Sequence, residues 1–344
     1  MKVLVTGGCG FLGSHVCEYY RVKGDEVVSF DNLTKGELMR TGYNVEDARF
    51  HNWKILKELG VSLVKGDIRN KQELLGETKD CDYIVHTAAQ PAMTIAIENP
   101  ELDLGSNVVG TFHVLEAARK YDIPVVVCSS IHVYGNGINE TIREGKTRFI
   151  REPPSIDESY PILEGKITPL HSSKRATEIY TQAYIDTYGL NAAIYRLTGM
   201  YGPRQFGGED HGWVANFLIR TVLGMPIRIF GTGKQVRDIL YVSDAVDAIV
   251  AFNKTRASGL YNIGGGLENI ISLGECLQLI RKIAGFKQKI IHEPKRLGDL
   301  WYFVCDIAKA RENLGWEPKV SNKAGLEKLN NWVKANVELF GGQL

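Results

Sequence analysis

The sequence predicts an α/β fold, a doubly wound parallel sheet with a smaller, interleaved C-terminal lobe. Two observations carry this prediction. Short, continuously apolar segments alternate with helical stretches through residues 1–199, which is typical of parallel strands covered by helices on both faces. At 344 residues, the chain is also too long for one ordinary core and long enough for one large sheet with an added lobe.

The expected elements follow one another as strand and helix units. Apolar strands are expected at residues 2–6, 27–30, 61–64, 83–86, 125–128 and 192–197, and helices at 11–24, 71–79, 107–121 and 169–188. The last helix has Pro169 in its first turn. Proline is tolerated there because the N–H that it lacks would have no acceptor within the helix. Small or polar residues follow the strands, and in such sheets ligands bind where the carboxyl ends of the strands point.

Glycine and proline punctuate the rest of the chain. Residues 134–168 are expected to form a long loop that folds over the site. Gly-Thr-Gly-Lys at 231–234 lacks the spacing of a phosphate-binding loop and is expected to be a hairpin turn, and the glycines at 264–266 are expected to bend the chain after a strand. We assign residues 1–199 and 232–258 to the sheet domain, and residues 200–231 and 259–344 to the smaller lobe.

The composition argues against several classes of function. The chain has 41 basic and 40 acidic side chains, so its long-range field is weak, and capture of nucleic acid or of an anionic membrane is not expected. No window approaches about 18 uninterrupted apolar residues, and residues 2–5 read directly into a strand, so we expect a cytoplasmic protein without a signal peptide. The six cysteines include no Cys-x-x-Cys pair, which argues against a metal site and against a disulfide framework.

A glycine-rich turn links the first strand to the first helix. Its glycines Gly7, Gly10 and Gly13 are spaced G-x-x-G-x-x-G. Glycine lets the backbone approach a pyrophosphate, and the start of the helix supplies free N–H groups and the positive end of a dipole. Asp31 follows the second strand, where a carboxylate can accept both hydroxyls of an adenosine ribose and repel a 2′-phosphate. The turn therefore predicts a dinucleotide site that prefers NAD to NADP.

Together with Asp67 after the third strand and Thr87-Ala88-Ala89-Gln90 after the fourth, this turn resembles the extended short-chain dehydrogenase/reductase family. The resemblance covers nearly the whole chain and implies a Rossmann domain that binds NAD. By that resemblance, the cofactor-binding residues are Gly7, Gly10, Phe11, Leu12, Gly13, Asp31, Asn32, Asp67, Ile68, Ala88, Ala89, Gln90, Asn107 and Lys174.

The reaction site is expected after the fifth strand. Ser130 and the following Val133-Tyr134-Gly135 resemble the family's Ser/Thr-x-x-Val-Tyr-Gly element, which implies that the Ser130 hydroxyl binds the reacting sugar oxygen. A hydroxyl can donate and accept, which suits an oxygen that alternates between alcohol and carbonyl. The family's Tyr-x-x-x-Lys signature implies that Lys174 holds the nicotinamide ribose, but Leu170 stands at the tyrosine position.

The missing tyrosine leaves the proton acceptor open among three side chains. We expect His171 to take this role, because it lies three residues before Lys174 and can share its helix face. A neutral imidazole needs no large pKa shift to accept a proton near pH 7. His132 and Tyr134 are the alternatives. By resemblance, His132 occupies the position of a glutamate that removes a proton in the family's 4,6-dehydratases.

Later segments resemble the nucleotide-sugar branch of the family, and in particular the CDP-tyvelose (CDP-paratose) 2-epimerases. These segments are residues 90–94, 200–206, 211–214 and 231–238. The resemblance implies that Arg237 and Arg296 hold the substrate diphosphate, for which a planar guanidinium is suited. Gly199 departs from the pattern, because many nucleotide-sugar relatives carry an amide there. The expected substrate-binding residues are Gln90, Met93, Thr198, Arg204, Trp213, Arg237 and Arg296.

The sequence therefore predicts an isomerase that uses NAD to epimerise a CDP-, UDP- or GDP-hexose, at C2, by transient oxidation to a keto sugar. The alternative enzyme is a nucleotide-sugar 4-epimerase or 4,6-dehydratase, although Ile131-His132 replaces the usual Asp-Glu pair of the dehydratase. An NAD-bound sensor or scaffold is the alternative without catalysis. It is motivated by Leu170, but a sensor has no need of Ser130 and Lys174 together with two arginines. A homodimer or homotetramer is expected.

Overall fold

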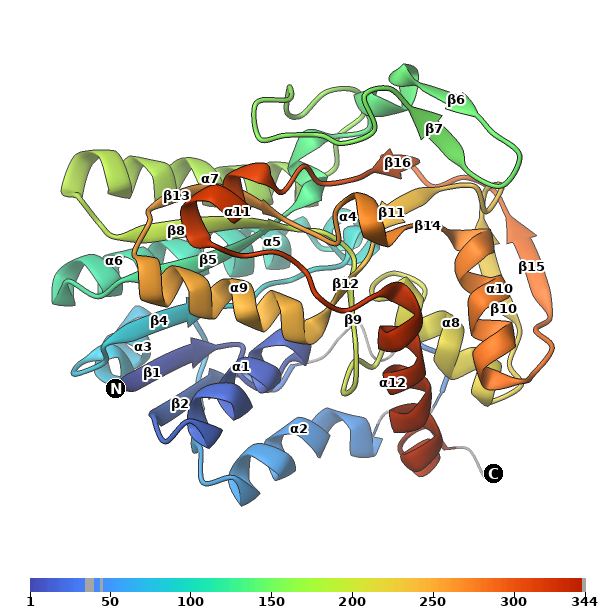
Figure 1. The fold of residues 1–344 in the computed structure, drawn as a ribbon. Helices are drawn as coiled ribbons and strands as arrows, with labels where there is room; N and C mark the ends of the chain where they lie inside the picture. Colours follow the sequence, from blue (N-terminus) through green and yellow to red (C-terminus); the bar gives the residue numbers. More distant parts are fainter. Residues whose placement is uncertain (35–39, 44–45, 342–344) are drawn as a thin grey trace.

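The protein is built around one large parallel sheet (Figure 1). This computed structural model describes residues 1–34, 40–43 and 46–341, and within them the sheet has seven strands in the order β13-β8-β5-β4-β1-β2-β3. The strands are β1 (Lys2–Thr6), β2 (Glu26–Asp31), β3 (Ser62–Lys65), β4 (Tyr83–His86), β5 (Val125–Ser130), β8 (Ala192–Leu197) and β13 (Gly259–Ile263). All six strands expected from the apolar segments are present, and their pairings are parallel.

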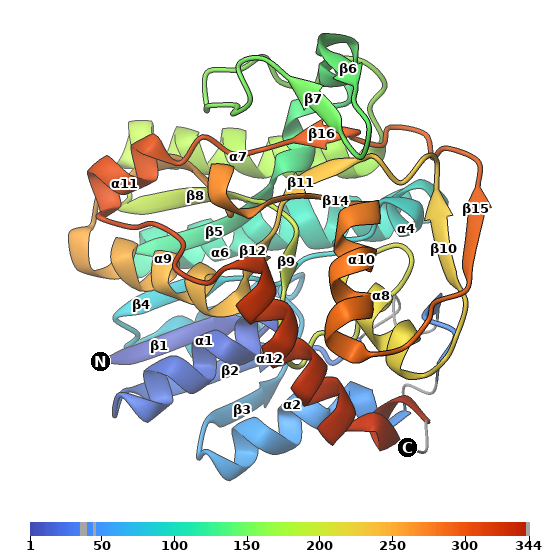
Figure 2. The same cartoon turned by 45° about the vertical axis from the view of Figure 1, so that its right-hand side comes forward.

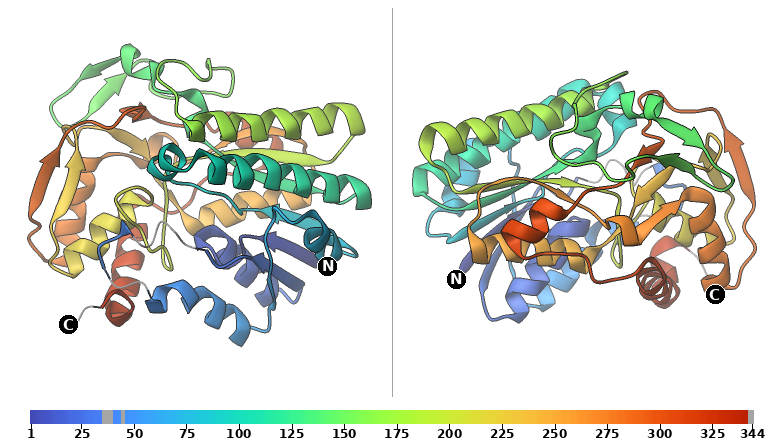
Figure 3. Two further views of the ribbon diagram at one scale, coloured as in Figure 1. Left: turned by 180° about the vertical axis from the view of Figure 1, so that it is seen from behind. Right: turned by 45° about the horizontal axis from the view of Figure 1, so that its top comes forward.

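Helices cover both faces of this sheet (Figure 3). One face carries α1 (Phe11–Val22), α2 (Glu46–Glu58) and α9 (Val242–Thr255), and the other carries α3 (Lys71–Thr78), α6 (Gly110–Tyr121) and α7 (Pro169–Tyr188). In β1, Val3 and Val5 belong to the first of these two core regions, whereas Leu4 belongs to the second. Successive residues of a strand point to opposite faces, so a strand that is buried on both sides must be apolar throughout.

The helix expected at residues 107–121 begins earlier and is irregular. After the short helices α4 (Met93–Glu98) and α5 (Pro100–Asp103), residues Leu104–Val109 form a turn of π-helix, η2, that runs directly into α6. Wider turns of this kind are rare and occur mostly at functional sites. Here the π-turn contains Asn107, one of the expected cofactor residues.

The smaller lobe lies beside the carboxyl ends of the large sheet (Figure 2). Its strands form a pair, β10-β15, and a group of three, β14-β11-β16, and a further pair, β9-β12, adjoins the large sheet. Its elements are β9 (Met200–Tyr201), α8 (Trp213–Val222), β10 (Ile227–Phe230), β11 (Val236–Asp238), β12 (Leu240–Tyr241), β14 (Ile270–Ser272), α10 (Leu273–Ala284), β15 (Ile290–Glu293), β16 (Tyr302–Phe303) and α12 (Asn322–Ala335). The helix α11 (Ala308–Leu314) packs instead against α9 and β13 of the large sheet.

Two expectations about turns have different outcomes. The bend at 264–266 is confirmed, because it directly follows β13, and its last glycine donates an N–H to Asp238 Oδ2 at 3.1 Å. The hairpin expected at 231–234 is wrong, because this turn joins β10 to β11, which belong to different sheets. A turn motif determines a local change of direction, but the partners of the strands on either side are chosen by tertiary packing.

The expected domain boundary also needs correction. β13 (Gly259–Ile263), assigned to the lobe, is the edge strand of the large sheet and pairs with β8. β11, assigned to the sheet domain, pairs instead with β14 and β16 of the lobe. The chain passes between the large sheet and the lobe several times. The sequence of a short apolar segment does not indicate whether it joins the large sheet or a sheet of the lobe.

The segment at 134–168 does not fold over the site as expected. It contains the antiparallel pair β6 (Ile142–Glu144) and β7 (Phe149–Arg151), which lies over β16 at the outer side of the lobe (Figure 1). The ring of Phe149 stacks on Trp301 with centroids 5.6 Å apart, so apolar packing holds the hairpin to the lobe. None of its residues lines the central cavity described below.

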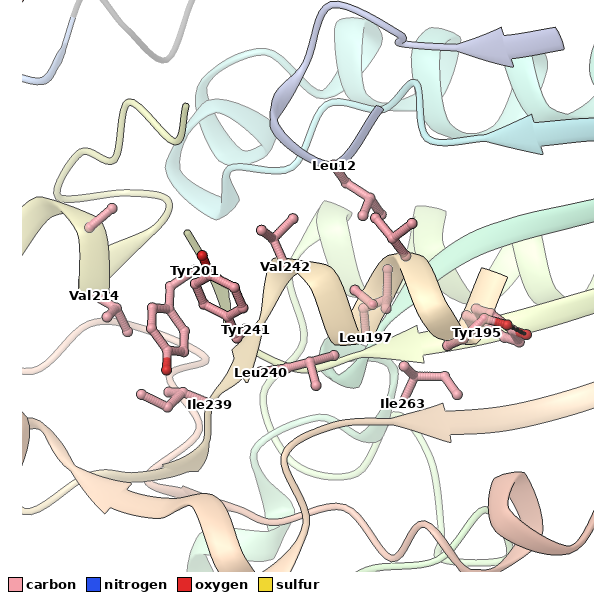
Figure 4. Packing of buried hydrophobic residues seen from close by; sticks show 14 of the residues in the cluster. Leu12, Tyr195, Leu197, Tyr201, Val214, Ile239, Leu240, Tyr241, Val242 and Ile263 are labelled. Carbon is pink, nitrogen blue, oxygen red and sulfur yellow. Dashed lines mark hydrogen bonds between the residues drawn. The ribbon is translucent and has the colours of Figure 1, made fainter. Parts of the chain in front are cut away.

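The core is continuous from the large sheet into the lobe (Figure 4). Tyr201 and Tyr241 pack edge to face with ring centroids 5.6 Å apart, beside Val214 of α8. Gly325 of α12 lies so close that a Cβ there would be 2.1 Å from the Tyr201 hydroxyl oxygen. This packing fixes the lobe against the sheet. In the described residues, no helix combines the length and apolar character needed to cross a membrane.

Candidate active site

A cavity of about 440 Å³ lies where the lobe meets the carboxyl ends of the strands. Its wall includes the loops after β1, β4, β5 and β8, the start of α7, and residues of α8, β10 and β11. The strand order reverses between β1 and β4, which is where open α/β sheets bind their ligands. The expected glycine-rich turn and the expected arginines therefore face one continuous space.

The glycine-rich turn between β1 and α1 has no room for side chains. Gly7 has a φ of +69°, and a Cβ on it would lie 2.7 Å from the backbone nitrogen of Ala88. A Cβ on Gly13 would lie 2.2 Å from the Gly7 carbonyl oxygen. The loop after β4 can therefore lie directly against the turn, and the first turn of the helix packs closely on the strand.

The start of α1 is open towards the cavity. Gly10 is its N-cap residue, and no side chain caps the helix. Phe11 and Leu12 also line the cavity, so the first N–H groups and the positive end of the helix dipole are available to an anion. Asn52 of α2 holds the turn in place, because its Nδ2 donates to the carbonyls of Cys9 and Gly10, at 3.0 and 3.3 Å. This geometry fits the pyrophosphate of a dinucleotide.

The carboxylates that follow β2 and β3 are held by hydrogen bonds. Asp31 accepts from the backbone N–H groups of Cys9 and Leu33, at 2.9 and 2.7 Å. Asp67 accepts from Arg69 and from Asn32 Nδ2, and the hydrogen bond from Arg69 is the main reason that its pKa is lowered to about 2. Asp31 is therefore fixed beside the glycine-rich turn, and Asp67 is held by Arg69 and Asn32. The neighbouring Ile68 is buried and packs against Gly110 of α6.

The loop after β4 is fixed by a buried amide network. Asn107 accepts from the Gln90 N–H at 2.9 Å and donates to the Gln90 carbonyl at 3.0 Å and to Asp103 at 2.9 Å. Ala89 lines the cavity. Gln90 and Asn107, which were expected to bind the cofactor, are thus hydrogen-bonded to each other. These hydrogen bonds hold the loop that carries Ala88 and Ala89 in place beside Gly7.

Ser130 and Lys174 come together on the cavity wall. Ser130 ends β5 and caps the short 3-10 helix η3 (Ile131–Tyr134), its Oγ accepting from the His132 N–H at 3.3 Å. Lys174 of α7 donates from Nζ to the Cys128 carbonyl at 3.1 Å, and burial lowers its pKa. Leu170 lies one turn before Lys174 and also lines the cavity, so the position of the family's tyrosine is filled by an apolar side chain.

His171 lies behind the wall and not on it. Its side chain is fully buried, and its Nδ1 accepts from the N–H of Thr168 at 3.1 Å and bonds the Thr168 hydroxyl at 2.8 Å. It therefore completes a capping box at the start of α7. Burial lowers its pKa to about 4. The shared helix face expected from its spacing to Lys174 is not realised, because one residue's rotation turns this side chain away from the cavity.

His132 does line the cavity. Its ring contacts that of His171 edge to face, with centroids 5.5 Å apart, and its buried Nδ1 has no hydrogen-bond partner among the described residues. Burial is the main reason that its pKa is lowered to about 3. The remaining alternative, Tyr134, is engaged elsewhere: its hydroxyl bonds Asn262 Oδ1 at 2.8 Å and the Asp157 carbonyl at 3.1 Å.

The two expected diphosphate ligands line the far part of the cavity. Arg237 donates to the carbonyls of Val236 and Leu300, at 2.7 and 2.6 Å, with Asp299 at 3.8 Å. Arg296 lies 3.6 Å from the centre of the Phe230 ring, and Asp210 is 3.3 Å from its Nη2. Each guanidinium is held by neighbours and still belongs to the cavity wall, as a diphosphate site requires.

Four of the other expected substrate residues, Met93, Thr198, Arg204 and Trp213, line the cavity with different engagement, whereas Gln90 does not belong to its wall. Met93 and Trp213 are on the wall. Thr198 donates from its hydroxyl to the buried Asp238 at 2.9 Å. Arg204 is directed towards α1, where its guanidinium bonds the side chains of Glu18 and His15. The Arg204 charge is thus paired with Glu18, although the residue also lines the cavity.

Several wall residues were missed in the sequence. They include Asn52, Thr94, Glu209, Asp210, His211, Arg228, Phe230 and Asp299. Half of them, Glu209, Asp210, His211 and Asp299, lie on irregular segments, where no periodicity indicates orientation. Asp299 alone had a usable signal, since it follows the Arg296-Leu297-Gly298 turn, and a turn between a cation and an anion can bring both to one site.

Taken together, a dinucleotide cradle and a serine–lysine pair on one cavity define an NAD-dependent enzyme of the Rossmann type. The chain belongs to the NAD dependent epimerase/dehydratase family, whose profile matches residues 3–264. It is thus an enzyme of that family, and NAD is its cofactor.

Individual relatives agree with this assignment over the whole chain. The protein is 35% identical to the CDP-paratose 2-epimerase of Salmonella typhi, over 97% of this chain and 100% of that protein. It is 33% identical to a putative UDP-glucose 4-epimerase of Methanocaldococcus jannaschii, over 97% of this chain and 99% of that protein. The crystal structure of Thermus thermophilus UDP-glucose 4-epimerase with NAD has a TM-score of 0.80 at 29% identity, covering 98% of this chain and 100% of that chain.

Proposed function

We propose that the protein epimerises a nucleotide-activated hexose at C2. The observation that carries the proposal is one cavity whose wall includes the glycine-rich turn and Lys174 together with Arg237 and Arg296. A dinucleotide and a diphosphate-linked sugar can therefore occupy one continuous space. The choice of C2 is supported by the full-length similarity to the CDP-paratose 2-epimerase of Salmonella typhi, and the similarity to UDP-glucose 4-epimerases makes C4 the alternative.

The chain's own residues divide the work by position. Gly7, Gly10 and the first turn of α1 would hold the pyrophosphate of NAD, Asp31 its adenosine ribose and Lys174 its nicotinamide ribose. Bound NAD supplies a reversible hydride acceptor. Ser130 would hydrogen-bond the reacting sugar oxygen, which changes between alcohol and carbonyl.

The arginines have a second task in an epimerase. A keto sugar must turn within the cavity before it is reduced on its other face, and it must not leave while it turns. Arg237 and Arg296 would hold the diphosphate during this turn, because charge-assisted contacts to phosphate are among the strongest hydrogen bonds in proteins. The sugar is then the only part of the substrate that needs to move.

A product analysis tests the proposal. The purified enzyme is incubated with CDP-, UDP- and GDP-hexoses in deuterated buffer, and the products are read by NMR. We expect inversion at C2 with no deuterium at that carbon, because the same hydride returns. Inversion at C4 would replace C2 by the alternative, and deuterium at C6 with loss of water would indicate 4,6-dehydration. No turnover of any of these sugars would favour an NAD-bound sensor.

A further inference from the structure

We propose that His132 is the catalytic acid and base of this enzyme, in the role that a tyrosine of α7 has in its relatives. The inference rests on the proposed function, since oxidation of a sugar hydroxyl requires a group that takes its proton. It differs from the expectation for His171, and it depends on where the two imidazoles lie and on which of their ring nitrogens are in use.

The position of His132 is suited to the role. It follows Ser130 by two residues on η3, which packs against α7, and both side chains line the cavity together with Lys174. A sugar oxygen bound by Ser130 would therefore lie beside the imidazole. The buried Nδ1 of His132 has no partner among the described residues. The buried Nε2 of His171 is likewise without a partner among the described residues. An unpartnered buried nitrogen is costly unless a ligand or a water satisfies it, and of these two rings only that of His132 lines the cavity, so we assign a substrate group as the partner of its nitrogen.

The hydrogen bonds of His171 exclude it on two grounds. Its Nδ1 accepts from the Thr168 N–H, so the neutral ring carries its proton on Nε2. The ring nitrogen left over is then a donor and cannot accept a proton from a substrate. The side chain is also fully buried and does not belong to the cavity wall.

The other candidates near Lys174 are unsuited as well. Burial raises the pKa of Cys128 to about 12, so its thiol is neither a base nor a thiolate near pH 7. The hydroxyl of Tyr134 is already hydrogen-bonded to Asn262 Oδ1 and the Asp157 carbonyl. His211 also lines the cavity, but on the loop that carries Glu209 and Asp210, whose atoms engage Arg296, and not on the η3 helix that follows Ser130.

The proton balance of the step is simple. The O–H bond of the reacting hydroxyl breaks, and an N–H bond forms at Nδ1 of His132. The C–H electron pair leaves the same carbon as hydride to the cofactor that the proposed function requires, so the alcohol becomes a ketone. In the return step the N–H proton goes back to the oxygen as hydride returns to carbon, and neither the imidazole nor the cofactor is changed over a cycle.

A matched pair of variants tests the inference. His132→Gln and His171→Gln each remove one imidazole, and glutamine at position 171 retains the capping box because it occurs naturally at that position of the motif. We expect His132→Gln to lower kcat by at least about 100-fold, the usual contribution of a positioned acid or base, with unchanged NAD affinity and melting temperature. His171→Gln should keep kcat near that of the wild type. The reverse pattern, or normal turnover in His132→Gln, overturns the inference.

A second measurement on the wild-type protein does not depend on either variant. With ¹⁵N-labelled histidine, the ring signals of His132 and His171 are followed while CDP-glucose or UDP-glucose is added to the NAD-loaded protein. We expect the Nδ1 signal of His132 to shift as a hydroxyl donates to it, and that of His171 to stay. A bound sugar that leaves the His132 signal unmoved contradicts the inference. If the wild type turns over no nucleotide sugar, the proposed function fails first and the inference with it.

Discussion

Asp31 illustrates how one side chain sets cofactor preference. The backbone N–H groups of Cys9 and Leu33 hold its carboxylate at the end of β2, and each oxygen keeps a second lone pair for a ribose hydroxyl. Asp31→Asn should reduce the preference for NAD over NADP by about tenfold or more, because it removes the charge that repels a 2′-phosphate. Asp31→Ala should in addition weaken NAD itself. Calorimetric titration of both cofactors checks this, and equal affinity of the wild type for NAD and NADP would contradict it.

Variants of Arg237 and Arg296 should distinguish a role in substrate binding from a role in the stability of the fold. Arg296→Ala should raise KM at least tenfold with little change in melting temperature, since each charge-assisted contact to phosphate contributes about 1.5 to 3 kcal/mol. Arg237→Ala should raise KM and also lower the melting temperature, because the Leu300 carbonyl loses its donor in a buried environment. Kinetics and calorimetry on both variants decide this. The exposed Arg311, paired only with Glu317, gives the control Arg311→Ala, for which neither quantity should move.

At the scale of one element, α7 depends on its first turn. Lys174 reaches the cavity only if the helix begins at Pro169, and the capping box of Thr168 and His171 holds that start in place. The register is also fixed further along the helix, where Arg196 of β8 donates to both oxygens of the buried Glu178 at 2.9 and 2.8 Å. A cap and an ion pair together prevent the helix from sliding.

This gives a prediction for the cap itself. His171→Ala should lower the free energy of unfolding by about 1 to 3 kcal/mol, since the buried Thr168 N–H loses its acceptor. His171→Gln should restore most of that loss, because its amide oxygen can accept the same hydrogen bond. Denaturant unfolding of the two variants checks the difference. Equal stability of His171→Ala and the wild type would show that the cap contributes nothing.

At the scale of the whole molecule, the surface formed by η2, α6 and α7 is where we expect self-association. Five large apolar side chains of η2 and α7 are at least 40% exposed: Leu104, Val109, Ile179, Tyr180 and Tyr188. Phe112 of α6 and Tyr180 of α7 lie in ring contact, so the two helices present one surface. Exposed apolar patches of this kind mark protein interfaces.

We expect a homodimer or homotetramer that uses this face. Replacing Ile179 and Tyr180 together by glutamate should shift the protein towards monomer, as measured by size-exclusion chromatography with light scattering. Val22 of α1 is 70% exposed on another surface, and Val22→Glu should leave the assembly unchanged. A wild-type protein that is monomeric at micromolar concentration would contradict the prediction.

Buried neutral histidines make the whole fold sensitive to acid. Burial lowers the pKa of His15, His86 and His132 to about 3 and that of His171 to about 4. Unfolded, these rings bind protons near pH 6.5, so below that pH proton uptake favours the unfolded chain until the folded pKa values are reached. Asp238, whose pKa burial raises to about 6, opposes this, and so do Asp103, Glu158, Asp244 and Asp299, whose pKa burial also raises.

The melting temperature should therefore fall progressively as the pH is lowered from 7 to 4.5, and calorimetry across this range measures it. A constant melting temperature would be inconsistent with buried neutral imidazoles. Protonation of His171 should not reduce activity near pH 6, because the pKa of that ring in the folded protein is about 4.

Much of the fold and part of the site could be predicted from the sequence because they depend on local rules. A strand buried on both faces must be apolar throughout, so six strands of the large sheet were visible as apolar runs. Gly7 and Gly13 were recognisable because a close backbone approach leaves no alternative to glycine. Lys174 was placed by a motif whose spacing matches a turn of helix.

The sequence by itself thus determined the parallel sheet, the dinucleotide cradle and the absence of the usual tyrosine at Leu170. Only the tertiary structure decided which sheet each lobe strand joins and which histidine faces the cavity. His132 and His171 are equally polar, and each lies within three residues of a motif residue, Ser130 or Lys174. Their difference arises from a helix rotation of about 100° per residue and from hydrogen bonds to Thr168, and neither can be read without the packing around them.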